Sequence, residues 1–499
     1  MGGFLFLLIF VTNIMAMFSV KKDSFLSWII CLGAFIASVA TIGVDNSFGV
    51  VIGSLMEVLD STTSKIAWIQ SIHSSFMFLF AFFSSLMLKT LSFRCVIFTG
   101  TFLCSVSYVA CIYFENYIGL IIGYGVVGGA GSGILFTPAN IACVHYFDKH
   151  KAVATGIAMS GGGFGTMGVS LLCSYMNITY GYKAYFLTIC VISSLTIFFA
   201  IFASPLQIVD VEEIKKANID SKNRNDSFNT EITIDQDAAK YQPGNQQDIQ
   251  DDNKLGTFDI STSLRRSSVA LDTHINAIGG SKTKEDMSEA KTRNFTQNIR
   301  LLLKDKRMIC YCIAHVFFEL AYYVPMVFLP EMMIEDQGIS KEWAGTIISI
   351  LGLCHMIGKV LTGLLVQYSK ISPIIYSSVS IGIIGVVCIG LTFCTLYSHF
   401  ASITAIYGLF LSSFDVFLPL VLIEMFGDDK LKDSYGIIMI AKMFSPIWGP
   451  PIGGAFKDWK GSYNVAFYAS GTFQLIGSLF NALVYLFHWK YRTIQKTRL

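Results

Sequence analysis

Residues 184–205 read AYFLTICVISSLTIFFAIFASP, a stretch without a single charged side chain. A transmembrane helix needs about 20 mostly apolar residues, which is the length of this run. The composition then reverses, because residues 210–307 hold 17 acidic and 16 basic side chains, 33 of the 70 charged residues in a chain of 499. The contrast predicts a membrane protein that carries one solvated segment.

Similar apolar runs recur on both sides of the charged segment. In lipid the backbone must satisfy its own hydrogen bonds, so each run is expected to be a helix, and the alternation of an outer-membrane barrel is absent. The sequence predicts an all-α membrane protein of 12 transmembrane helices in two six-helix bundles, residues 23–205 and 308–489. The predicted spans are 28–52, 66–88, 95–114, 117–143, 152–175, 184–205, 308–331, 343–367, 372–394, 400–425, 434–456 and 464–488.

Three further segments complete the predicted organisation. Residues 206–307 are polar and poor in aromatic side chains, which predicts a disordered cytoplasmic loop, and residues 490–499 form a cytoplasmic tail. Residues 1–22 are an apolar segment for which an extra helix, an interfacial helix and a misassigned start codon remain open. Lysine and arginine favour the cytoplasmic side of short loops. They number 13 on the side of the charged segment and five on the other, so both termini are expected in the cytoplasm.

The composition also excludes several function classes. Charged residues make up 14% of the chain, well below the roughly 25% of a soluble domain. The net charge of +2 does not supply the basic face that nucleic-acid binding needs. Most of the 12 cysteines lie in apolar runs without a CxxC pair, so no zinc site is indicated. We expect no enzyme, cofactor, metal or nucleic-acid partner, and a lipid bilayer as the surroundings.

Three local motifs are more specific than the apolar runs: YFDKHKA at 146–152, VPMVFLP at 324–330 and WGPPIGG at 448–454. With the six-plus-six arrangement, they resemble the monocarboxylate transporter family of the major facilitator superfamily. Residues 23–28 keep the acid and the tryptophan of the family's opening motif but not its glycines, as in a divergent member. The resemblance implies alternating access for a small carboxylate-bearing solute at the plasma membrane. In some members of the family a single-pass glycoprotein assists delivery.

Glycines repeat at four-residue spacing inside several predicted spans. Small residues at this spacing let helix backbones approach closely. A nucleotide-binding loop would need a preceding strand, which the sequence does not predict. The packing or gating positions that we expect are Gly156, Gly161, Gly165, Gly449, Pro450 and Gly453.

Ionisable residues inside the spans are the best functional signal, because they cost several kcal/mol unless they face a wet cavity or a partner. His315 and Glu319 are four residues apart, as are His355 and Lys359, so each pair shares a helix face. A packing role for His315 is an open alternative. Lys442 is a further ionisable residue inside a span, for which snorkelling near a membrane face is the open alternative. The candidate substrate or coupling residues are Asp45, Asn46, His315, Glu319, Tyr322, His355, Lys359, Ser412 and Asp415.

The resemblance assigns roles to three of these positions. Lys359 aligns with a family arginine that is taken to attract the substrate carboxylate. His355 and Asn46 replace the Asp and the Lys of proton-coupled members, so proton coupling stays open. One alternative is facilitated transport of amino acids or other organic solutes, with Asp415 or Glu319 meeting an amine. Another is a non-transporting receptor or scaffold of the same fold.

Overall fold

The computed structural model describes residues 22–61, 63–202, 299–369 and 371–498. These residues form helices and short connections, and no strand occurs among them. The predicted helix within residues 1–20 and nearly all of the predicted loop 206–307 lie outside the described residues.

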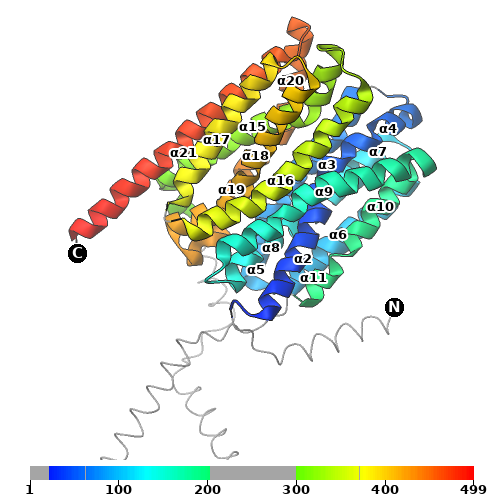
Figure 1. Ribbon diagram of the computed structural model, residues 1–499. Helices are drawn as coiled ribbons and strands as arrows, with labels where there is room; N and C mark the ends of the chain where they lie inside the picture. Colours follow the sequence, from blue (N-terminus) through cyan, green and yellow to red (C-terminus); the bar gives the residue numbers. More distant parts are fainter. Residues whose placement is uncertain (1–21, 62, 203–298, 370, 499) are drawn as a thin grey trace, which may run out of the picture. The chain divides into compact units, whose positions relative to one another are not determined.

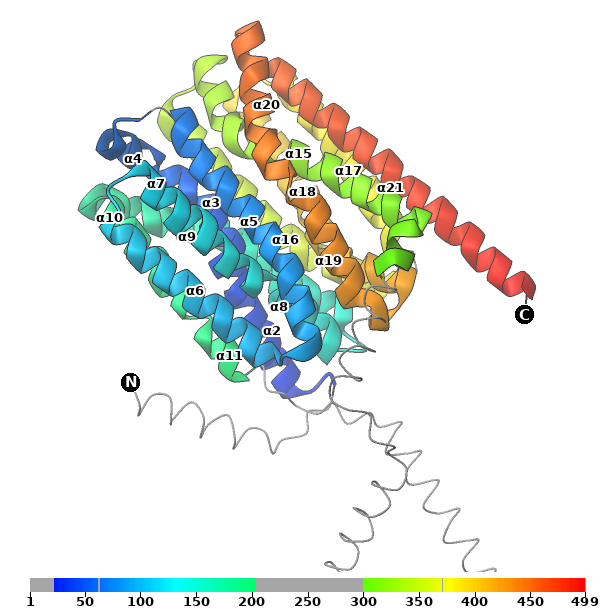
Figure 2. The same ribbon diagram turned by 180° about the vertical axis from the view of Figure 1, so that it is seen from behind.

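The first half is a bundle of six membrane-spanning elements (Figures 1 and 2). The first and fourth of these contain π-helical or 3-10 segments, whereas α5 and α9 are continuous. In chain order the elements are α2 (Phe25–Ser38), η1 (Val39–Gly43), α3 (Val44–Ser47), η2 (Phe48–Val51), α4 (Ile52–Leu59), α5 (Thr63–Thr90), α6 (Phe93–Tyr113), α7 (Tyr117–Leu120), η3 (Ile121–Gly128), α8 (Gly129–Tyr146), α9 (Lys151–Tyr180), α10 (Tyr182–Ser194) and α11 (Ile197–Phe202).

The second half repeats the arrangement. Its elements are α15 (Lys306–Glu335), α16 (Lys341–Tyr368), α17 (Pro373–Gly390), η4 (Leu391–Phe393), α18 (Tyr397–Phe426), η5 (Asp428–Lys430), α19 (Leu431–Lys442), α20 (Ser445–Lys460) and α21 (Asn464–Arg498). The helices α9 and α16 lie side by side along the junction of the halves, and α5 packs against α19 (Figures 1 and 2).

Eleven stretches of the described chain are long and apolar enough to cross a membrane. The remaining predicted span, 434–456, is divided into α19 and α20, with Pro446 in the first turn of α20. Proline lacks an N–H and is tolerated in a first turn, where no intrahelical partner exists. Pro325 and Pro419, by contrast, lie inside helices that continue past them.

The segment boundaries differ from the prediction at two places. Residues 299–304 are helical and Asp305 caps α15, so the second bundle begins before residue 308. Arg307 is buried and donates to the Met425 carbonyl oxygen at 3.1 Å and to the Asp305 carboxylate at 2.6 Å. Helix α21 continues to Arg498, so the predicted tail extends the last helix rather than leaving it.

Glycines occur where helices approach most closely. A Cβ at Gly156 of α9 would lie 2.5 Å from the Lys359 carbonyl oxygen of α16, and a Cβ at Gly165 would lie 2.7 Å from the Gly43 Cα. At Gly161 the obstacle is the Phe35 carbonyl oxygen. In the second half Gly449 and Gly453 pack α20 on α15, where a Cβ would lie 2.9 Å from the Leu320 oxygen and 2.7 Å from Phe328. Pro450 lies between them in α20.

Polar contacts join the two halves at the end of the bundle where α11 lies, here called the linker end (Figure 1). Lys151 pairs with Asp428 at 3.1 Å, and Lys89 pairs with Asp433. The Lys432 ammonium donates to the Leu88 carbonyl oxygen at 2.7 Å. These contacts bridge the two halves at the linker end.

Candidate functional site

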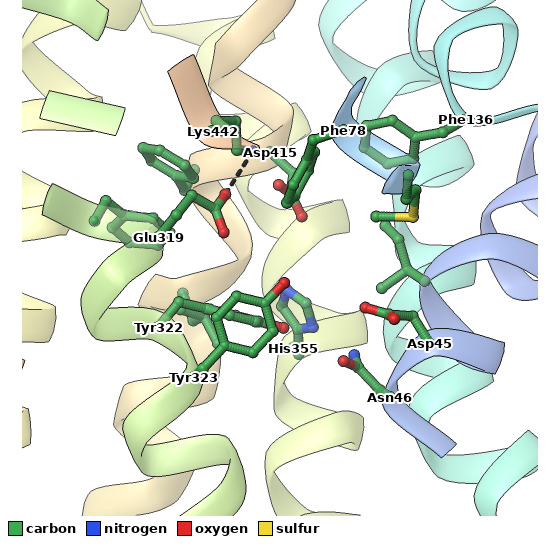
Figure 3. Close-up of a pocket in the computed structure, with 15 residues that line it drawn as sticks. Asp45, Asn46, Phe78, Phe136, Glu319, Tyr322, Tyr323, His355, Asp415 and Lys442 are labelled. Atoms are coloured by element: carbon green, nitrogen blue, oxygen red, sulfur yellow. Dashed lines mark ion pairs between the residues drawn. The ribbon is translucent and has the colours of Figure 1, made fainter. Parts of the chain in front are cut away.

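A cavity of about 50 Å³ lies between the two halves. A single water needs roughly 10–15 Å³ by this measure, so the space holds several waters. Six of the lining side chains come from the first half and nine from the second, and Figure 3 shows them converging on one space. They are Ile42, Asp45, Asn46, Met77, Phe78, Phe136, Phe318, Glu319, Tyr322, Tyr323, His355, Leu411, Phe414, Asp415 and Lys442.

One ion pair crosses the second-half wall of the cavity. Lys442 is the last residue of α19, and its ammonium lies 2.5 Å from a Glu319 carboxylate oxygen on α15 (Figure 3). Both side chains are buried. The ammonium also lies 4.9 Å from the ring centre of Phe78 in the first half and 5.4 Å from that of Phe414, within the range of cation–π attraction. Lys442 therefore contacts both halves.

A second ion pair lies beside the first. The Lys359 ammonium of α16 donates to a carboxylate oxygen of Asp415 on α18 at 3.0 Å. Lys359 is fully buried and does not line the cavity, whereas Asp415 does and is 24% exposed. The Lys359 ammonium therefore does not contact the cavity directly but is paired with Asp415, which lines it.

Asp45 of α3 belongs to a polar cluster in the first half. Its Oδ1 accepts from the Gln70 amide at 2.6 Å and from the Ser74 hydroxyl at 2.8 Å, and it lies 2.9 Å from Nδ1 of His73. The neighbouring Asn46 donates to the Thr166 hydroxyl at 2.9 Å. Asp45 thus lines the cavity, and side chains of α5 hold its carboxylate in place through hydrogen bonds.

Three predicted residues lie outside the cavity lining. His315 is fully buried between Tyr311 and Phe414, with ring centres 4.5 and 4.3 Å away, and neither ring nitrogen has a hydrogen-bond partner among the described residues. Ser412 donates to the Leu409 carbonyl oxygen. Lys359, as above, is screened by Asp415.

The structure brings six of the nine predicted polar residues to one cavity. These are Asp45, Asn46, Glu319, Tyr322, His355 and Asp415. The list of candidate residues left out Lys442 and His73. Lys442 was noticed as an ionisable residue inside a span, and the alternative that it snorkels at a membrane face is excluded because its ammonium is buried against Glu319. For His73 the signal was Gln70, Ser71 and Ser74, which put four polar residues within five positions of an apolar span.

The charges of the cavity are nearly balanced. Asp45, Glu319 and Asp415 supply three carboxylates, and Lys442 and Lys359 supply two ammonium groups in contact with two of them. Buried charges persist when they are paired in this way. A charged solute must therefore exchange with an existing pair or bring its own counter-charge.

Comparisons with known proteins agree with this architecture. A model of the Major Facilitator Superfamily matches residues 24–309 and 311–497. Monocarboxylate transporter 14 of Mus musculus is 24% identical over 467 residues, covering 91% of this chain and 89% of its own. Monocarboxylate transporter 9 of Mus musculus is 24% identical over 485 residues, covering 95% of each chain.

Solved structures share the fold at low sequence identity. The proton:xylose symporter XylE is 13% identical with a TM-score of 0.61, over 91% of this chain and 94% of that one. The transporter FucP in its outward conformation is 15% identical with a TM-score of 0.56, over 92% of this chain and 98% of that one. The predicted fold and the predicted resemblance are confirmed. This chain belongs to the Major Facilitator Superfamily, as a divergent relative of its monocarboxylate transporters.

Proposed function

We propose that this protein is a secondary transporter that carries a small carboxylate-bearing solute by alternating access. The observation that carries the proposal is the position of Lys442, whose ammonium lines a cavity between the halves and contacts side chains of both. Rocking of one half against the other, as in related transporters, would expose such a site to each side in turn. The relatives' name, monocarboxylate transporter, supports this solute class.

In this proposal the solute carboxylate takes the place of a protein carboxylate. Lys442 can exchange Glu319 for the solute, because both lie on the cavity wall and the pair lies at a helix end. Lys359 then serves mainly as the counter-ion that keeps Asp415 charged. The aromatic side chains Phe78, Phe136 and Tyr322 shield the exchange from water and favour an organic solute.

A second solute class has its own support. Asp415 presents a carboxylate to the same cavity as the Lys442 ammonium. A zwitterionic amino acid has one group for each of these side chains and needs no extra proton to enter a balanced cavity. A bare monocarboxylate adds one negative charge, which a co-transported proton would neutralise.

The orientation and address are proposed with the function. The basic residues Lys22, Lys89 and Lys151 lie at the linker end of the bundle. The excess of lysine and arginine in the short loops on this side supports a cytoplasmic linker end. We expect delivery to the plasma membrane. Co-expression with a single-pass glycoprotein of the kind that assists related transporters tests whether this chain also needs one.

Uptake in oocytes tests the proposal. The probes are labelled lactate, pyruvate, aromatic amino acids and creatine, each at several external pH values. Uptake of lactate or pyruvate that is lost in Lys442→Met/Glu319→Gln at wild-type surface expression supports the proposal. Uptake that is independent of pH favours the amino-acid alternative, and no uptake despite surface expression favours a receptor or scaffold.

A further inference from the structure

Helix α21 is longer than a membrane crossing requires. Its 35 residues extend for about 52 Å, whereas the hydrocarbon core of a bilayer is about 30 Å thick. Figures 1 and 2 show its C-terminal end reaching beyond the neighbouring helices of the second half at the linker end. The last turns of α21 therefore leave the hydrocarbon core and enter the headgroup region on that side.

Buried Arg307 fixes this part of α21 on the start of α15. Its Nη1 lies 3.2 Å from Nδ1 of His488, and its guanidinium lies 4.4 Å from the ring centre of Tyr491. These contacts join residues 299–306 and 488–492 into one surface, here called the basal patch.

Basic side chains gather on the basal patch without acidic partners. Five of them are exposed, and no ion pair joins any of the five to another residue that the structure describes. They are Arg300, Lys304, Lys306, Lys490 and Arg492. The one carboxylate in these two segments, Asp305, pairs instead with Arg307 at 2.6 Å. At the opposite end, by contrast, Lys457 of α20 is paired with Glu335 at 2.8 Å. The described residues therefore leave the positive charge of the basal patch unneutralised.

Large apolar side chains are exposed on the same patch. Leu301 is 57% exposed, Leu303 52% and Trp489 62%, although Leu302 between the two leucines is buried. Tryptophan is enriched where a membrane meets water, and leucines beside basic residues are typical of a segment that lies in the interface. A free anion would leave these apolar groups in water, so the combination fits a lipid surface better than a dissolved ligand.

We propose that the basal patch binds the headgroups of anionic phospholipids and thereby anchors the second half in the leaflet at the linker end. The basic side chains attract the phosphate and carboxylate groups of the lipid, and each such side chain near an anionic surface strengthens binding roughly fivefold. Trp489 and the two leucines enter the boundary between headgroups and acyl chains. No residue of the cavity takes part, so this inference does not depend on the proposed transport function.

Fluorescence quenching of Trp489 tests the proposal in the full chain. The protein is reconstituted in phosphatidylcholine vesicles that contain the same mole fraction of either brominated phosphatidylserine or brominated phosphatidylcholine. The chain has six tryptophans, so the Trp489 signal is the difference between wild type and Trp489→Phe. Wild type is expected to bind phosphatidylserine roughly fivefold or more tightly than phosphatidylcholine, and added salt is expected to reduce this preference.

Equal quenching of Trp489 by the two lipids overturns the proposal. This is also the result expected if the basal patch is covered by another partner, such as the acidic residues of the charged segment 206–298, instead of lipid.

Variants of matched charge separate the basal patch from the overall charge of the protein. Lys490→Gln/Arg492→Gln is expected to abolish most of the lipid preference at Trp489. Lys457→Gln/Lys460→Gln removes the same charge at the opposite end of the bundle and is expected to keep the wild-type preference. A preference that survives in Lys490→Gln/Arg492→Gln, or that falls equally in both variants, overturns the proposal.

The start of α15 supplies a second test, independent of substitutions in α21. Lys304→Gln/Lys306→Gln is expected to lower the preference at Trp489 at least about twofold, because the two segments form one surface. Both positions are exposed, so the melting temperature in detergent is expected to stay at the wild-type value. An unchanged preference in this variant overturns the assignment of residues 299–306 to the lipid site.

Discussion

The Lys442 ammonium lies 2.5 Å from the Glu319 carboxylate at the point where α19 ends. The pair joins the broken helix to α15 and lies on the wall of the cavity between the halves. Its position links stability to function, because the charge proposed to attract the solute also needs a partner when no solute is bound.

Removing one member of this pair is expected to destabilise the protein more than removing both. Lys442→Met leaves Glu319 buried without its counter-ion, which costs about 3–5 kcal/mol. Adding Glu319→Gln is expected to recover most of that loss, and thermal unfolding of the purified protein in detergent measures it. The exposed pair of Lys183 and Glu115, 2.8 Å apart, gives the control: Lys183→Met leaves the melting temperature unchanged. Equal loss in the single and double variants would contradict the pairing.

Tight packing of α9 on α16 predicts a position-specific effect of added methyl groups. Gly156→Ala places a Cβ 2.5 Å from the Lys359 carbonyl oxygen, and such overpacking costs about 1–3 kcal/mol. Gly168→Ala on the same helix meets only Phe164 at 3.7 Å and is expected to be neutral or slightly stabilising. Thermal melts of both variants check this. Similar melting temperatures for the two would show that the helices do not approach closely at Gly156.

Asp23 gives a prediction for acidic pH. Burial alone would raise its pKa, but backbone N–H groups of Lys149, Asp148 and His150 donate to the carboxylate, and its pKa lies below the ordinary 3.8. A carboxylate whose pKa is lowered in the native state stabilises the protein at pH values above its unfolded-state pKa. This stabilisation is lost as the pH falls through the native-state pKa. Asp23→Asn is therefore expected to melt earlier at pH 7, with the difference shrinking below about pH 4. A difference that is constant from pH 7 to 3 contradicts this role.

The ion pairs at the linker end are expected to hold that end closed. Asp433→Asn removes the partner of Lys89 and is expected to shift the population toward a state open at this end. A loss of about 1 kcal/mol corresponds to a roughly fivefold shift. Hydrogen–deuterium exchange in the first turns of α19 should increase. Glu335→Gln, which breaks the 2.8 Å pair with Lys457, is the control. Unchanged exchange in Asp433→Asn would contradict the closure.

The sequence was sufficient for the helices because each is an apolar run of membrane length. The predicted span 343–367 is observed as α16, Lys341–Tyr368, and 308–331 as α15, Lys306–Glu335. Prolines inside the spans were expected to kink or locally break helices, and the eleventh span is divided into α19 and α20 just before Pro446. Proline alone does not mark such a break, because Pro325 lies inside an unbroken α15.

The partners of the charged residues could not be read from the sequence. Spacing within one helix places His355 and Lys359 on one face, but it does not say which other helix that face meets. Lys359 meets Asp415 of α18 and is thereby screened from the cavity. The same holds for Asp45, whose partner His73 lies on the next helix. Asp23 and the 146–152 motif were noticed separately, and the structure joins them through the backbone of residues 148–150.

Uptake of a labelled carboxylate by proteoliposomes tests the central claim most directly, with wild type, Lys442→Met and the double variant Lys442→Met/Glu319→Gln compared at equal protein content. Wild type is expected to accumulate the solute. The double variant is expected to remain folded, because no buried charge is left unpaired, and yet to lose uptake at least about tenfold, as loss of a charge-assisted contact of 1.4 kcal/mol or more predicts. Wild-type uptake in the folded double variant would contradict the claim that Lys442 receives the solute carboxylate.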